Sequence, residues 1–154
     1  MYGDCRETLK ELPEQSINTC ITSPPYWGLR NYQEEEQLGL EDTPEEFVEN
    51  LVKVFREVKR VLRDDGTVWL NLGDSYYNYR PGKGQSLIKQ TVSNTNQDLP
   101  QEVARRANKI DGLKEKDLVG IPWRVAFALQ ADGWYLRQDI IWNKPNPMPE
   151  SVQD

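Results

Sequence analysis

The feature that most constrains this fold is a capped amphipathic helix. Thr43-Pro44-Glu45-Glu46 has the chemistry of a helix N-terminus, because Thr43 can cap, Pro44 suits the first helical position and Glu46 completes a capping box. Asp64-Asp65-Gly66 is predicted to end the helix, with Gly66 as its C-terminal cap. Between these signals the apolar side chains recur at helical spacing: Phe47, Val48, Leu51, Val54, Phe55, Val58, Val61 and Leu62.

Short strands are predicted on both sides of this helix. Residues 17–23, INTCITS, form a short apolar run, and residues 67–74, TVWLNLGD, are rich in apolar and β-branched side chains. A strand, a helix and a second strand in this order favour a parallel pair with the helix packed on one face.

The second half of the chain continues the alternation after an interruption. Residues 75–117 are polar and lack steady periodicity, which predicts a long mobile loop with a short helix near 100–109. A second helix is predicted to begin at Gly120-Ile121-Pro122 and to end at Asp132-Gly133. Residues 134–144, WYLRQDIIWNK, are strand-like.

This order predicts an α/β fold with a mostly parallel sheet and flanking helices. A chain of 154 residues is long enough for one domain. The predicted strands are few, however, and give the helices only a narrow sheet face. Residues 1–154 are therefore predicted to be a single but incomplete domain.

Composition excludes several kinds of chemistry. The chain has no histidine, and Cys5 and Cys20 form no CxxC pair, so no metal site and no Ser-His-Asp chemistry are expected. The net charge of −6 argues against a simple nucleic-acid-binding domain. The chain contains no run of about 18 apolar residues, so no membrane span is expected. The N-terminus carries acidic residues where a signal peptide needs an apolar stretch, so export is not expected. We expect a cytoplasmic protein.

The SPPY tetrad, residues 23–26, follows the first predicted strand directly. Pro24 and Pro25 fix their own φ angles and donate no N–H, and Ser23 is pushed toward an extended conformation. The tip therefore presents a hydroxyl and bare carbonyls, acceptors that suit an amino group, while Tyr26 and Trp27 offer flat faces for a ring. These features describe a nucleobase site, although a plain proline turn or a PxxP-like segment would use the same residues.

A family resemblance extends beyond the tetrad. The segment TSPPYWGLRNY resembles the catalytic loop of prokaryotic amino-group DNA methyltransferases, which methylate N4 of cytosine or N6 of adenine with S-adenosylmethionine. GDCRETLKELPEQSINTCITSPPYW is similar to the N-terminal block of the subgroup in which this loop precedes the cofactor glycine motif. FVENLVKVFREVKRVLRDDGTVWLNLGD and KDLVGIPWRVAFALQADGWYLRQDIIWNKPNPMPESV resemble the blocks that follow. The resemblance implies a partial Rossmann-like methyltransferase sheet.

The resemblance implies a catalytic role for Ser23, Pro24, Pro25 and Tyr26. The Ser23 hydroxyl and the Pro24 carbonyl would accept hydrogen bonds from the target amine and aim its lone pair at the methyl group. Tyr26 would stack on a base flipped out of the duplex. Serine at the first tetrad position favours cytosine N4 over adenine N6.

Further positions match cofactor and substrate sites of the family. Asp4 would meet the adenine end of S-adenosylmethionine, with Cys5 contributing backbone; an ordinary helix cap is the alternative for Asp4. The proposed substrate-binding residues are Trp27, Arg30, Asn31, Trp142 and Lys144. Loop packing is the alternative for the first three, and a strand-end aromatic with a surface lysine is the alternative for the last two.

One family feature is missing from the sequence. No FxGxG-type segment is found, and GKG at 82–84 has no strand before it. The chain is therefore interpreted as a truncated or split methyltransferase that acts on double-stranded DNA with a second chain or segment. The alternatives are an inactive remnant that serves as a DNA-binding or assembly module, and an RNA or protein amide methyltransferase.

Overall fold

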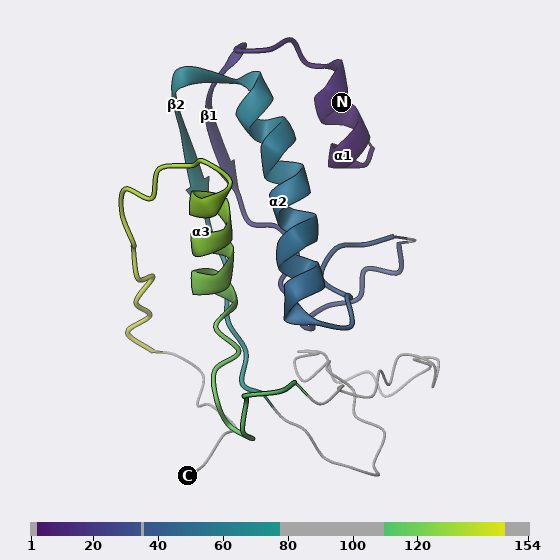
Figure 1. Ribbon diagram of the computed structural model, residues 1–154, viewed down its shortest axis with the longest axis vertical. Helices are drawn as coiled ribbons and strands as arrows, with labels where there is room; N and C mark the ends of the chain where they lie inside the picture. The colour runs from purple at the N-terminus through teal and green to yellow at the C-terminus, as the bar shows by residue number, and fades with distance from the viewer. Residues whose placement is uncertain (1–2, 35, 78–109, 147–154) are drawn as a thin grey trace.

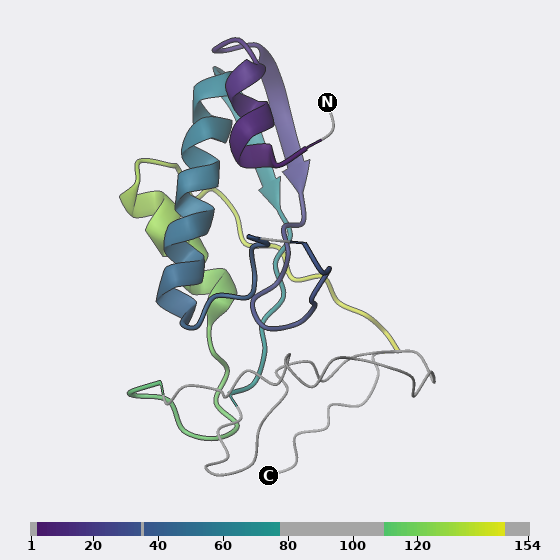
Figure 2. The same cartoon turned by 90° about the vertical axis from the view of Figure 1, so that its right-hand side faces the viewer.

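The computed structural model describes residues 3–34, 36–77 and 110–146. Three helices form a layer over one face of a two-stranded sheet, with α2 between α1 and α3 (Figures 1 and 2). The elements, in chain order, are α1 (Cys5–Thr8), the short 3-10 helix η1 (Leu9–Glu11), β1 (Ile17–Thr22), α2 (Pro44–Val61), β2 (Leu62–Leu70) and α3 (Ile121–Ala131). The described part is thus a small α/β fold, as the alternation predicts.

Helix α2 begins as its sequence predicts. The Thr43 side chain accepts from the Glu46 N–H, and the Glu46 side chain accepts from the Thr43 N–H, which completes the capping box. Seven side chains of α2 are buried toward the sheet and α3: Pro44, Phe47, Leu51, Val54, Phe55, Val58 and Val61. Burial of this apolar face anchors the helix, because helices in proteins draw most of their stability from tertiary packing.

The predicted end of α2 was wrong. The helix stops at Val61 and β2 begins at Leu62, so Gly66 lies within the strand and not at a helix cap. The last carbonyls of α2 are satisfied from elsewhere in the chain: the Gln15 N–H donates to Arg60 O at 3.1 Å and the Ser16 N–H donates to Val61 O at 2.9 Å. A glycine cap is not needed where distant N–H groups take the free carbonyls.

The sheet consists of β1 and β2, paired in parallel, with Thr19 opposite Thr67 and Ile21 opposite Trp69. Its two faces differ. The face toward the helices carries Cys20, Val68 and Leu70, which pack against the core. The other face is open, and Ile21 is 79 % exposed and Trp69 51 % exposed on it.

Helices α2 and α3 are joined at one end by polar contacts. Arg56 on α2 donates to the Asp132 carboxylate at 2.6 Å, and this pairing lowers the pKa of Asp132. Lys59 donates to the Gly133 carbonyl at 2.9 Å, and the Phe55 ring meets the Trp134 ring edge-on at 6.4 Å between centroids. The turn after α3 is therefore fixed to α2.

The predicted loop over 75–117 is joined at its two ends. Tyr76 pairs with Leu118 in an antiparallel bridge, and the buried Tyr77 donates its N–H to Asp117 O at 2.7 Å. The short helix predicted near 100–109 lies outside the described residues.

The predicted strand over 134–144 does not form. Among the described residues, no strand pairs with this segment. Trp134 packs on the core, but the side chains that follow it are exposed: Tyr135 is 83 % exposed and Ile141 84 %. A strand pattern specifies a strand only where a neighbouring strand supplies the other half of the hydrogen bonds.

Candidate functional site

The SPPY tetrad lies at the carboxyl end of β1, where the ladder stops. The last strand contact is the Asn71 N–H, which donates to Thr22 O at 2.9 Å. Pro24 and Pro25 cannot continue the ladder because they have no N–H. Ser23 is exposed at this tip, and its Oγ donates to the Tyr26 Oη at 3.3 Å. The two hydroxyl groups of the tetrad thus face each other.

Tyr26 is held between two glycines. A Cβ on Gly39 would lie 2.8 Å from the Tyr26 carbonyl oxygen, so the backbone of Tyr26 packs directly on Gly39. A Cβ on Gly73 would lie 2.8 and 2.9 Å from Cε2 and Cδ2 of the Tyr26 ring, so the ring packs on the bare backbone that follows β2. Neither glycine was predicted to contact the tetrad, although a glycine at position 73, inside the predicted strand 67–74, is a signal for close backbone approach.

The structure places Trp27 in the core, as the packing alternative expects. Its ring is 5 % exposed, and its Nε1 donates to the Glu41 carbonyl at 3.0 Å. The Glu41 carboxylate accepts from the Gly39 N–H at 2.8 Å and from Asn50 Nδ2 at 3.1 Å. Trp27 therefore ties the segment after the tetrad to α2.

Arg30 and Asn31 lie on a closed loop between the tetrad and α2. The Gly28 N–H donates to Gly39 O at 2.8 Å and closes the base of this loop. The Asn31 side chain accepts from the Gln33 N–H at 2.7 Å, so it supports the turn, whereas the Arg30 side chain is exposed. Of these two residues, Arg30 is the one whose side chain is open to a partner.

Asp4 caps α1, which is the alternative considered for it. Its carboxylate accepts from the Arg6 N–H at 2.8 Å and from the Arg6 guanidinium at 2.5 to 3.0 Å. These hydrogen bonds lower the pKa of Asp4. Cys5 is the exposed first residue of α1, and partial burial raises the pKa of its thiol.

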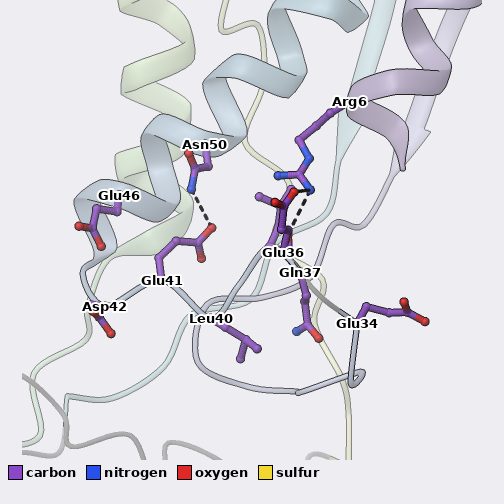
Figure 3. A pocket seen from close by; sticks show the side chains of 10 residues that line it. Arg6, Glu34, Glu36, Gln37, Leu40, Glu41, Asp42, Glu46 and Asn50 are labelled. Carbon is purple, nitrogen blue, oxygen red and sulfur yellow. Dashed lines mark hydrogen bonds and ion pairs between the residues drawn. The ribbon is translucent and has the colours of Figure 1, made fainter. Parts of the chain in front are cut away.

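An open hollow of about 630 Å³ lies beside the Asp4–Arg6 pair, between α1, the loop that joins the tetrad to α2, and the start of α2 (Figure 3). Arg6 reaches into it and donates to the Glu36 carbonyl at 3.2 Å. The lining is Arg6, Glu34, Glu36, Gln37, Leu38, Leu40, Glu41, Asp42, Glu46 and Asn50. The tetrad does not line this hollow, so the hollow and the acceptor tip are separate features.

Trp142 and Lys144 lie on the segment that follows α3. Trp142 is 75 % exposed, and Lys144 is exposed as well. Within the described part of the chain, no hydrogen bond joins either residue to the tetrad. The contacts described above join Ser23, Tyr26, Gly39 and Gly73.

No group of three or more His, Cys, Asp or Glu side chains is arranged to hold a metal ion among residues 3–34, 36–77 and 110–146. No helix described there is long and apolar enough to cross a membrane.

Together, the α/β fold and the acceptor tip at a strand end define a Rossmann-like domain with a rigid polar site beyond its sheet. The DNA methylase family model, which covers N6 and N4 methylases, matches residues 17–154. The chain belongs to this family.

Similarity to curated proteins agrees with this assignment. The chain is 54 % identical over 152 residues to Type II methyltransferase M.XycI of Xanthomonas campestris pv. cyanopsidis, covering 99 % of the chain and 48 % of that protein. It is 49 % identical over 154 residues to Type II methyltransferase M.SmaI of Serratia marcescens, covering 100 % of the chain and 50 % of that protein. The chain thus spans about half the length of these relatives.

A solved structure of similar fold agrees as well. It is a protein of Thermus thermophilus, provisionally assigned as a DNA modification methylase, with a TM-score of 0.56 and 23 % identity. The similarity covers 97 % of this chain and 48 % of that one. The partial Rossmann-like fold is thereby supported.

Proposed function

We propose that this chain is the catalytic-loop half of a DNA amino-methyltransferase that uses S-adenosylmethionine and favours N4 of cytosine. The observation that carries the proposal is the Ser23 hydroxyl, exposed at the carboxyl end of β1 with its proton donated to Tyr26 Oη at 3.3 Å. Because the proton is directed to Tyr26, the lone pairs of Ser23 Oγ are left to accept from an amino group.

The tetrad's other atoms extend this acceptor site. The Pro24 carbonyl follows Ser23 on a stiff backbone and supplies a second acceptor, while the Tyr26 ring supplies a stacking face for a flipped base. Two acceptors on one amine orient its nitrogen lone pair and support the positive charge that develops during methyl transfer. Because serine is a weak base, the amine would attack while it still holds both protons, and the methylated, positively charged amine would then lose one proton to water.

S-adenosylmethionine supplies the electrophilic methyl group. The exposed carboxylate of Asp4 and the backbone of Cys5, at the start of α1, suit a ribose or adenine contact. Asp4 is already paired with Arg6, so a cofactor hydroxyl would share this carboxylate with the guanidinium. We place the glycine-rich cradle for the methionine part on a further segment or chain.

Two observations support such a complementing part. The chain spans about half of M.XycI and M.SmaI. One face of its sheet is open, with Ile21 79 % exposed opposite Trp69. Exposed apolar patches of this kind mark interaction surfaces. Double-stranded DNA is the proposed substrate, and Arg30, Trp142 and Lys144 are exposed side chains that could reach it.

The test is methyl transfer from labelled S-adenosylmethionine to duplex DNA. The chain is assayed alone and with the half of M.XycI that it does not match, and the DNA is hydrolysed to separate N4-methylcytosine from N6-methyladenine. We expect transfer only in the complemented mixture, and Ser23→Ala to lower it about 10²–10³-fold. Ser16→Ala, whose hydroxyl donates to Pro13 O at the start of β1, is the matched control. Equal transfer by Ser23→Ala would overturn the role of Ser23.

The second candidate is an inactive remnant that acts as an assembly module. The open sheet face favours it, because Ile21 and Trp69 would be covered in a self-associated form. Sedimentation of the chain alone separates the candidates. Concentration-dependent association without methyl transfer supports the remnant, and a monomer that transfers methyl groups when complemented supports the enzyme.

A further inference from the structure

Gly73 faces the catalytic loop from a distant part of the sequence. It follows β2, and its α-carbon lies so close to the Tyr26 ring that a Cβ would approach Cε2 at 2.8 Å and Cδ2 at 2.9 Å. Real Cβ atoms are not found at such distances. Gly73 has no positive φ, so its backbone would accept alanine. The space beside it, and not its backbone conformation, requires glycine.

The surroundings leave the ring as the part that must move. The Tyr26 carbonyl packs on Gly39, whose own φ of +93° and lack of a Cβ fix this approach. On the other side, the Asp74 carboxylate accepts from the Gly120 N–H at 2.9 Å and from the Ile121 N–H at 3.1 Å. These bonds attach the segment after β2 to the start of α3. A side chain at position 73 would therefore displace the ring and not the backbone on either side.

We infer that Gly73 is a positioning residue for the tetrad: it sets the Tyr26 ring so that Tyr26 Oη meets Ser23 Oγ. The inference rests on the proposed function for its catalytic consequence, because the orientation of the Ser23 lone pairs depends on where Oη lies. Gly73 is not itself an acceptor or stacking group of the site. It acts through Tyr26.

The first test measures the ring in the 154-residue chain. Nuclear Overhauser contacts between the Gly73 Hα and the Tyr26 ring protons are expected in the parent. In Gly73→Ala, the Tyr26 ring resonances are expected to shift. The matched control is Gly66→Ala in β2, where a Cβ would meet Arg63 O at 2.9 Å and Asn18 O at 3.1 Å, away from Tyr26. Unchanged Tyr26 resonances in Gly73→Ala, or equal changes in Gly66→Ala, would overturn the inference.

The second test uses the complemented mixture described above. Gly73→Ala is expected to lower kcat about 10- to 100-fold, because a displaced Tyr26 ring misplaces the groups that position the target amine. KM for S-adenosylmethionine is expected to stay unchanged. In a Tyr26→Ala background the same substitution should change kcat less than about twofold, since the ring is gone. Equal losses in both backgrounds would overturn action through Tyr26. If the resonances shift as expected but the parent transfers no methyl group, the proposed function fails and the placement of the ring stands.

Discussion

The segment after β1 and the segment after α3 contain similar residues but differ in how they are held. Both follow a regular element and carry tryptophan, a basic residue and proline. In the first, Trp27 is buried and bonded to Glu41. In the second, Trp142 is 75 % exposed, and no strand forms over 134–144. An apolar side chain is buried only where the fold supplies a surface to pack against, which Trp27 has and Trp142 lacks among the described residues.

The largest effect on stability is expected from a comparison of alanine substitutions at Trp27 and Trp142. Trp27→Ala removes a buried ring and the donor to Glu41 O, and it should lower the free energy of unfolding by about 3–5 kcal/mol. Trp142→Ala should change it by no more than about 0.5 kcal/mol, because that ring is exposed. Urea denaturation followed by circular dichroism measures both. Equal effects would show that Trp142 is packed in solution.

A smaller effect is expected from the carboxylate that joins the loop to α2. Glu41→Ala leaves the buried Gly39 N–H without its acceptor and frees Asn50, so it should cost about 1–3 kcal/mol. Glu49→Ala, at an exposed position of α2, is the control and should be nearly neutral. The same denaturation measurement applies. A neutral Glu41→Ala would mean that the loop is held by Trp27 alone.

The smallest effect concerns the pH dependence of Asp4. Because Arg6 lowers its folded pKa, Asp4 contributes stability that is present above the unfolded pKa, about 3.9, and is lost as the pH falls through the folded pKa. In a carboxyl-carbon NMR titration, Asp4 should titrate below an unpaired aspartate, and Arg6→Ala should move its pKa upward. Lys10→Ala, which removes the partner of Glu7, should leave the Asp4 titration unchanged. An unmoved pKa in Arg6→Ala would contradict the pairing.

Local chemistry explains what could be predicted of the fold. The start of α2 was predicted correctly because Thr43, Pro44 and Glu46 act within one turn. Its end was predicted at Gly66 and lies at Val61, because Gln15 and Ser16 from before β1 take the last carbonyls. The groups that cap the helix end come from a distant part of the sequence, so the residues around the helix end do not reveal them.

The candidate site divides in the same way. The tetrad could be located from its prolines and its place after a strand. Gly73 was missed because its contact with the Tyr26 ring joins residues that the parallel pairing of β1 and β2 brings together. For Trp27 the sequence left two interpretations open, a substrate contact and loop packing, and the structure buries its side chain.

The sequence by itself determined the elements whose causes are local: the capped helix α2, the stop of β1 at the two prolines and the acceptor groups presented there. Only the tertiary structure decided which glycine faces Tyr26, which tryptophan is buried and whether residues 134–144 pair. The physical reason is that caps and φ restrictions act within a few residues, whereas burial and strand pairing require surfaces that distant parts of the chain supply.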